Sequence, residues 1–124
     1  MGKLRDIDGD SITPLLKGKE DKKLDKRFLY FHYPHHRNTA PHSVVLQGDY
    51  KLFRFYERPD SHYLYNLKYN ISESENIAQQ NKTVVARLAK EMDRYHAAVK
   101  ACLPKPNPDA DPNYKPFDPG KGWE

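Results

Sequence analysis

The chain has 124 residues, which is the size of one modest domain. A net charge of only +4 and nine tyrosines argue against disorder over the whole length. No stretch is apolar enough for a membrane span or for the core of a signal peptide, and the single Cys102 excludes an intrachain disulfide. Basic and acidic residues are interspersed, so we expect neither nucleic acid nor a membrane as a partner.

Residues 1–27 are predicted to form an extended, polar leader. Its one apolar group consists of Ile12, Leu15 and Leu16, and proline and glycine residues flank this group. Such a group indicates a short turn that docks on another surface. The mixed charges from Lys17 to Arg27 are typical of a solvated linker.

Four short runs rich in aromatic and β-branched residues follow the leader, with turn residues between them. These runs predict four strands, at Phe28–Tyr33, Val44–Gln47, Tyr50–Tyr56 and Tyr63–Leu67. Only Gly48 and Asp49 separate the second run from the third, which is the spacing of a two-residue hairpin with a type II′ turn. The second and third strands are therefore expected to be antiparallel neighbours.

A helix of about Asn81 to Ala101 is predicted after the last strand. Apolar residues recur there at the spacing of an amphipathic helix, and the inward stripe is expected to include Leu88, Met92, Tyr95 and Val99. Asn81 is a candidate N-cap, and Pro104 prevents the helix from continuing.

The order of four strands and then one helix predicts an α+β fold, in which a four-stranded antiparallel sheet over residues 28–103 is packed by one C-terminal helix. The tail, residues 104–124, is rich in proline and is expected to lie extended. Three aromatic residues are unusual in a free tail: Tyr114, Phe117 and Trp123.

Both faces of the predicted sheet carry apolar residues. On the third strand, Tyr50 and Leu52 point to one side, whereas Phe53 and Phe55 point to the other. One helix covers only one face, so we expect a partner surface, in preference to solvent, on the second face.

A histidine-rich segment is the main candidate for chemistry. His32, His35 and His36 have three possible roles, which are metal binding, packing of a surface loop and contact with an anionic ligand. The adjacent pair after Pro34 disfavours coordination of one metal ion, and the permanently charged Arg37 favours the anion. No serine or cysteine stands in a nucleophile motif and no glycine-rich loop cradles a phosphate, so the residues alone indicate no catalytic site.

Six short motifs follow one another along the chain. The first is the leader Asp8-Gly9-Asp10-Ser11-Ile12-Thr13-Pro14-Leu15-Leu16-Lys17-Gly18. The others lie at Leu29–His36, Gly48–Leu52, Tyr63–Leu67, Glu73–Ala78 and Pro106–Pro108. In this order they resemble the C-terminal subdomain of type I sulfatases, the group of arylsulfatases and N-acetylgalactosamine-6-sulfatases. The resemblance covers about Asp8 to Pro119.

The resemblance implies that the catalytic groups of the enzyme belong to a large N-terminal domain. There the family makes a formylglycine nucleophile from a Cys/Ser-x-Pro/Ala-x-Arg motif and holds calcium with Asp and Asn residues. The segment Cys102-Leu103-Pro104-Lys105-Pro106 has proline where this motif requires arginine. We therefore expect no catalytic residue, metal or cofactor in this chain, and no activity from the chain alone.

The chain is accordingly expected to be the C-terminal part of a sulfatase acting on sulfated sugars or glycans. Its expected partners are the N-terminal catalytic domain and a sulfated carbohydrate, with His35, His36 and Arg37 as candidate substrate-binding residues. The family implies a periplasmic or secreted enzyme. The alternative is an independent binding module with a His-rich site for an anion or a carbohydrate.

Overall fold

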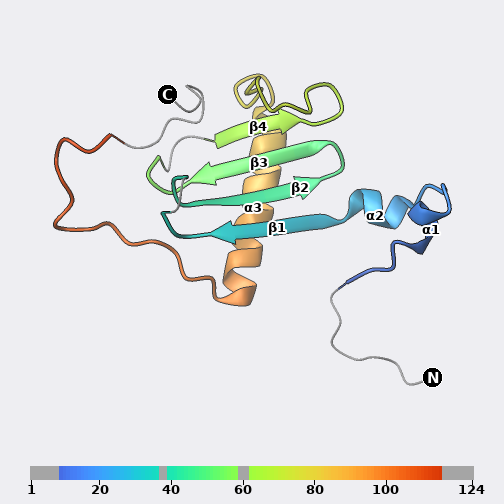
Figure 1. Cartoon of the computed structure of the whole chain (residues 1–124), viewed down its shortest axis with the longest axis horizontal. Coiled ribbons are helices and arrows are strands. Elements are labelled where there is room, and N and C mark those ends of the chain that lie inside the picture. Colours follow the sequence, from blue (N-terminus) through green and yellow to red (C-terminus); the bar gives the residue numbers. More distant parts are fainter. Residues whose placement is uncertain (1–8, 37–38, 59–61, 116–124) are drawn as a thin grey trace.

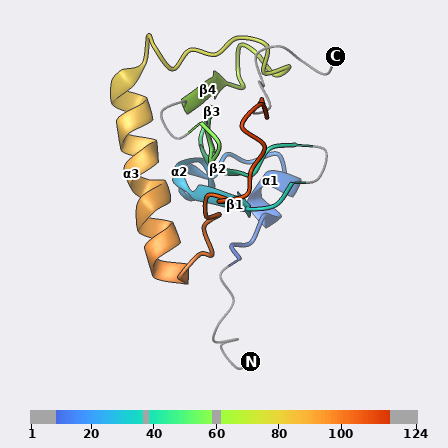
Figure 2. The same cartoon turned by 90° about the vertical axis from the view of Figure 1, so that its left-hand side faces the viewer.

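The computed structural model describes residues 9–36, 39–58 and 62–115. Two short helices, α1 (Thr13–Leu16) and α2 (Lys22–Lys26), precede four strands and a long helix. The strands are β1 (Phe28–Tyr33), β2 (His42–Gln47), β3 (Tyr50–Phe55) and β4 (His62–Asn66), and the long helix is α3 (Lys82–Val99). The strands form one antiparallel sheet in the order β1-β2-β3-β4. Figures 1 and 2 show α3 lying across one face of the sheet, which confirms the predicted α+β fold.

The β2–β3 hairpin has the predicted two-residue turn. Gln47 pairs with Tyr50 across the turn. Gly48 has a positive φ of +54°, whereas the φ of Asp49 is negative. A type II′ turn needs a positive φ at its first central residue only, which is where glycine stands. This turn sets the register that places Val45 opposite Leu52.

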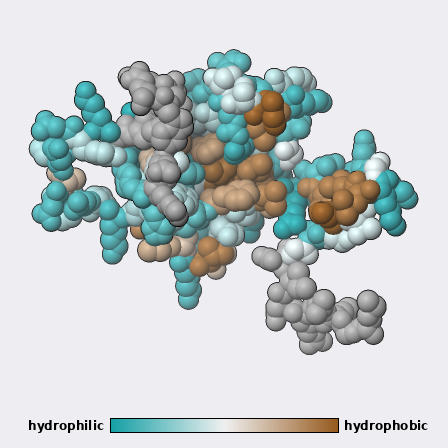
Figure 3. Space-filling model, viewed as in Figure 1, coloured by the Kyte–Doolittle hydropathy of each residue, from teal (hydrophilic) through white to brown (hydrophobic). Residues whose placement is uncertain are grey.

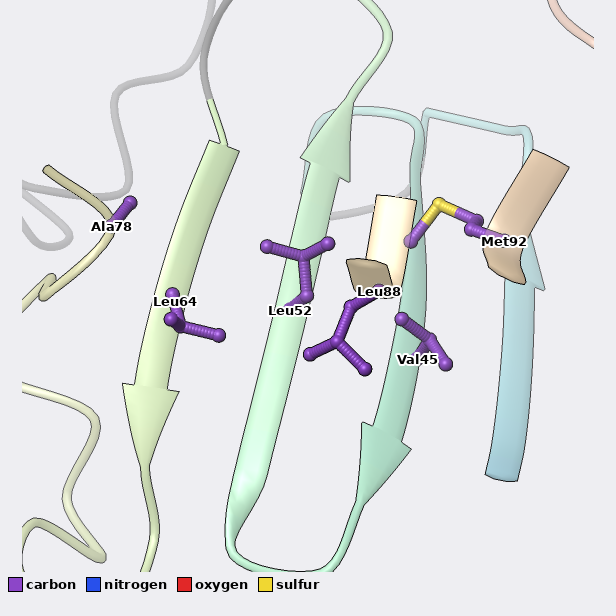
Figure 4. Close-up of a cluster of buried hydrophobic side chains, with 6 residues drawn as sticks. All are labelled: Val45, Leu52, Leu64, Ala78, Leu88 and Met92. Atoms are coloured by element: carbon purple, nitrogen blue, oxygen red, sulfur yellow. The ribbon is translucent and has the colours of Figure 1, made fainter. Parts of the chain in front are cut away.

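The hydrophobic core lies between the sheet and α3. Its buried members come from three strands, the β4–α3 connection and the helix: Val45, Leu52, Leu64, Ala78, Leu88 and Met92. Figure 4 shows these side chains converging from β2, β3 and β4 on the helix. Leu88 is fully buried and Met92 nearly so, as the helical spacing predicted. The apolar area removed from water at this interface is the main stabilising contribution to the fold.

The C-terminal turn of α3 differs from the prediction. Val99 is 51% exposed, whereas His96, one turn after Met92, is buried. Figure 1 shows the end of α3 projecting past the edge strand β1, so no strand lies beneath the last turn. The helix ends at Val99, earlier than predicted, because Lys100 adopts the left-handed conformation with a φ of +51°.

The leader also differs from the prediction, because it forms two short helices instead of one extended segment. Pro14 stands in the first turn of α1, and the Asp21 side chain accepts hydrogen bonds from two backbone N–H groups at the start of α2. The apolar group Ile12, Leu15 and Leu16 is 55%, 47% and 78% exposed. No described part of the chain covers this group.

The face of the sheet opposite α3, which we call the open face, is partly apolar as predicted. Figure 3 looks onto this face and shows hydrophobic surface over the strands. Val44, Phe55 and Tyr65 are buried there, whereas Leu29 and Phe31 on the edge strand are 41% and 57% exposed. The apolar surface left for a partner therefore lies beside β1. The tail has no helix or strand over residues 101–115, as its prolines predicted.

Replacing the fully buried Leu88 with alanine is expected to lower the free energy of unfolding by about 2 to 5 kcal/mol, because the change leaves a cavity under α3. The matched control is Val99→Ala on the exposed last turn, where the change is expected to stay within about 0.5 kcal/mol. Urea denaturation followed by circular dichroism measures both, and equal losses would contradict this placement of the helix.

Candidate functional site

The histidine-rich segment lies at one end of the sheet. Because the strands are antiparallel, the β1–β2 and β3–β4 connections emerge at the same end, on the left in Figure 1. The tail after α3 returns to this end as well. Side chains from three distant segments therefore meet there. They form two groups, one buried under α3 and one on the surface.

The buried group is a polar network centred on Ser43. The Ser43 Oγ lies 2.8 Å from His32 Nδ1, 2.6 Å from the Tyr56 hydroxyl and 3.0 Å from His96 Nε2. The His32 Nε2 lies 2.9 Å from the backbone carbonyl oxygen of Cys102. The network thus joins β1, β2, the end of β3, α3 and the start of the tail.

One arrangement of protons satisfies the four contacts named above, and the Tyr56 hydroxyl also lies 3.2 Å from His32 Nδ1. The Cys102 carbonyl can only accept, so His32 Nε2 donates to it and His32 Nδ1 accepts from the Ser43 hydroxyl. Ser43 Oγ then accepts from Tyr56 and from His96 Nε2. In the described part of the chain, no buried side-chain nitrogen or oxygen lacks a partner. In this arrangement His32 Nδ1 serves as an acceptor and His96 Nε2 as a donor.

Electrostatics favour the neutral form of His96. Burial lowers the pKa of His96 below its ordinary value of 6.5, the nearby His32 and Arg54 lower it further, and Asp93 acts in the opposite direction. Burial likewise raises the pKa of the Tyr56 hydroxyl. Ser43 is only 1% exposed, so no substrate can approach its oxygen. The network is a structural connection between the sheet, the helix and the tail.

The surface group contains the two histidines that the sequence singled out. His36 Nε2 lies 2.6 Å from Glu57 Oε1, and the His36 side chain is 58% exposed. The Tyr114 hydroxyl donates to the same carboxylate, at 3.3 and 3.2 Å from its two oxygens. The rings of His36 and Tyr114 make a T-shaped contact, with their centroids 6.3 Å apart. The exposed His35 contacts the Tyr33 ring, and Arg37 lies outside the described residues.

Sequence reasoning missed Glu57 as a member of this site. Nothing in its local pattern distinguishes it from other acidic residues, because its role depends on a contact with Tyr114, 57 positions later in the chain. The only signal for Tyr114 was its presence as an aromatic residue in a proline-rich tail.

Neither group brings together three metal-ligating side chains. Among the described residues, no three His, Cys, Asp or Glu side chains lie close enough to hold a metal ion. Cys102 is exposed and takes part in the buried network only through its backbone carbonyl. No described helix is long and apolar enough to cross a membrane. A hollow of about 500 Å³ lies at the other end of the molecule, between α1 and α2, and has Lys17, Lys19 and Lys23 in its wall.

Comparison with known proteins shows the family of this chain. The sequence model of the family described as N-sulphoglucosamine sulphohydrolase, C-terminal, matches residues 2–98. The chain belongs to this family. The match extends from the leader through the sheet and most of α3, and it confirms the resemblance to a sulfatase C-terminal subdomain that the ordered motifs indicated.

The chain matches only part of each similar protein. A protein of Formosa agariphila named sulfatase is 33% identical over 86 residues, which are 64% of this chain and 15% of that protein. A candidate sulfatase from Bacteroides thetaiotaomicron VPI-5482 has the same fold, with a TM-score of 0.64 and 21% identity over 94% of this chain and 26% of its own. A structure described as a 2-O GAG sulfatase has a TM-score of 0.65 and 23% identity over the same shares. The chain therefore spans about a quarter or less of these proteins.

The buried network is expected to make the stability of the fold depend on pH. Because the pKa of His96 is lowered in the folded state, the unfolded state binds its proton more readily. The contribution of the neutral His96 to the free energy of unfolding is therefore complete above pH 6.5. It is lost as the pH falls from 6.5 through the lowered pKa of the folded state. Burial and Arg54 also lower the pKa of His62, which adds to the same trend.

The variant His96→Gln tests this assignment, because glutamine keeps an N–H donor for Ser43 but does not titrate. Its melting temperature is expected to be lower than that of the wild type at pH 7.5, but to fall less between pH 7.5 and pH 5. Thermal melts at matched ionic strength measure both trends. Parallel curves for the two proteins would show that His96 does not carry the effect.

Proposed function

We propose that the chain is the C-terminal part of a sulfatase that hydrolyses sulfate esters of sugars or glycans. The match of the family over residues 2–98 carries this proposal. The names of the Formosa protein and of the 2-O GAG sulfatase support the substrate class. In this proposal the enzyme is periplasmic or secreted, as its resemblance to the type I sulfatases implies.

The chemistry of this enzyme belongs to an N-terminal catalytic domain. That domain would supply a formylglycine nucleophile and calcium, and this chain would hold neither. Its cysteine is followed by Leu103-Pro104-Lys105-Pro106, without the arginine that the formylglycine motif requires. The described residues also bring no three metal-ligating side chains together. In this proposal the chain supports the catalytic domain and does not act alone.

Two exposed apolar surfaces are suited to contact with the catalytic domain. The first is the leader group, Ile12, Leu15 and Leu16, and the second is the edge of the open face at Leu29 and Phe31. Apolar side chains with this much exposure are stabilised when a partner removes them from water. Both surfaces belong to residues that the family match includes.

The end of the sheet would face the substrate in this proposal. His35 and His36 are exposed on the loop after β1, and Arg37 follows them in the sequence. These three residues are candidates for contact with the sugar or sulfate, in a binding role and not as nucleophiles. The alternative function, an independent carbohydrate-binding module, is favoured by one observation, namely that His36, Glu57 and Tyr114 assemble within this chain alone.

Activity is expected only when this chain is joined to a catalytic domain. The DNA adjoining the coding sequence of this chain is expected to encode a segment with a Cys/Ser-x-Pro/Ala-x-Arg motif. The joined polypeptide should hydrolyse 4-nitrophenyl sulfate or a sulfated monosaccharide in the presence of calcium, and the chain alone should not. Turnover by the purified chain alone, or an adjoining sequence without that motif, would contradict the proposal.

A charge on the open face is expected to weaken the contact with the catalytic domain. Phe31→Asp places a carboxylate at the exposed edge of β1, where burial against a partner would require its desolvation. The joined polypeptide carrying this change should have a lower melting temperature and a lower kcat than the wild type. The matched control is Ile71→Asp, at a residue that is 80% exposed after β4, and it should alter neither quantity. Equal behaviour of the two variants would exclude this face as the contact.

A further inference from the structure

The surface group at the end of the sheet suggests a more specific role than general anion binding. It contains an exposed aromatic ring, a carboxylate and an imidazole, which come from the tail, the β3–β4 connection and the β1–β2 connection. We propose that Tyr114, Glu57 and His36 form a binding site for the uncharged, hydroxyl-bearing part of a sugar, and that the sulfate is not bound there. This inference rests on the proposed function for its substrate class.

Tyr114 supplies the apolar part of such a site. The residue is 51% exposed, and the hydrogen bonds from its hydroxyl to Glu57 fix the position of its ring. The electron-rich face of an aromatic ring attracts the weakly positive C–H groups that line one side of a sugar ring. A ring that is already anchored loses little conformational freedom when a ligand stacks on it.

Glu57 supplies hydrogen-bond acceptors for sugar hydroxyls. Its side chain is 20% exposed, and it already accepts from His36 and from Tyr114. A carboxylate has about four acceptor positions on its two oxygens, so an acceptor position remains for a hydroxyl donor. Hydrogen bonds to an ionised carboxylate are stronger than those between neutral groups.

The pairing of His36 with Glu57 is the observation that decides between sugar and sulfate. The His36 Nε2 donor is engaged with a carboxylate at 2.6 Å. A sulfate at this position would have to displace that carboxylate and would be repelled by its charge. A sugar hydroxyl can instead donate to the carboxylate while the pair stays intact. The geometry therefore fits a neutral hydroxyl group better than an anion.

A binding experiment on the full chain tests this inference with four probes. N-acetylglucosamine and N-acetylgalactosamine are titrated against the chain, each beside its 6-sulfated counterpart, and the ring signals of Tyr114 and His36 are followed by NMR. At least one of the two sugars is expected to shift both signals. The dissociation constants of that sugar and of its sulfated counterpart should agree within about threefold, because the sulfate makes no contact.

Variants of the chain separate stacking from general surface effects. Tyr114→Ala should weaken binding of the sugar and of its sulfated counterpart alike, by about fivefold or more. Tyr114→Phe keeps the ring and loses only the contact with Glu57, so its loss should be smaller. The matched control Tyr69→Ala removes a tyrosine that is 81% exposed elsewhere, and it should leave binding unchanged. The melting temperature of each variant verifies that the fold is kept.

Three outcomes would overturn the inference. They are the absence of a shift with all four probes, binding of the sulfated sugars only, and an equal loss in Tyr114→Ala and Tyr69→Ala. The proposed sulfatase function is tested separately by the activity of the joined polypeptide. If that activity is present without sugar binding here, only this inference fails. If sugar binding is present without activity, the sulfatase proposal fails and the chain is a carbohydrate-binding module.

Discussion

The fold depends on one constraint, which is that a single helix must bury one face of a four-stranded sheet. Leu88 and Met92 on α3 meet Val45, Leu52 and Leu64 from three strands, and these residues form the centre of the core. A sheet has two faces, and α3 can cover only one of them. The open face and the exposed leader group follow from this constraint. A small unit with so much uncovered apolar surface is suited to packing on a larger one, as its family membership implies.

The position of α3 also explains the buried polar network. The helix crosses the sheet toward the edge strand β1, so its fourth turn brings His96 over Ser43 and not over an apolar residue. A buried serine between two imidazoles is tolerated only when the polar groups around it have hydrogen-bond partners. Here the Tyr56 hydroxyl pairs with Ser43, and the Cys102 carbonyl pairs with His32. The network directs the chain back toward the end of the sheet after α3, where the tail then reaches Glu57.

The candidate site depends on that return of the tail. Tyr114 would be an ordinary exposed aromatic residue if the chain left the sheet in another direction. Its hydrogen bonds to Glu57 place it beside the loop that carries His36. The site is therefore built by the connections at one end of a sheet, on a scaffold that the core holds in place. Binding sites on loops that a rigid scaffold holds in place are common among proteins, since loops tolerate change in sequence more readily than the elements that position them.

The sequence by itself determined the local structure: the alternation of strand residues, the two-residue turn at Gly48 and Asp49, the helical spacing of Leu88 and Met92, and the order of motifs that indicated the family. Each of these depends on residues close together in the chain. The tertiary structure decided which turn of α3 passes the edge of the sheet, and hence that His96 is buried and Val99 exposed. It also decided that His32 meets the Cys102 carbonyl across 70 positions and that Tyr114 meets Glu57 across 57. Contacts at such separations depend on the direction in which the helix crosses the sheet and the tail returns, and periodicity along the chain carries no information about either direction.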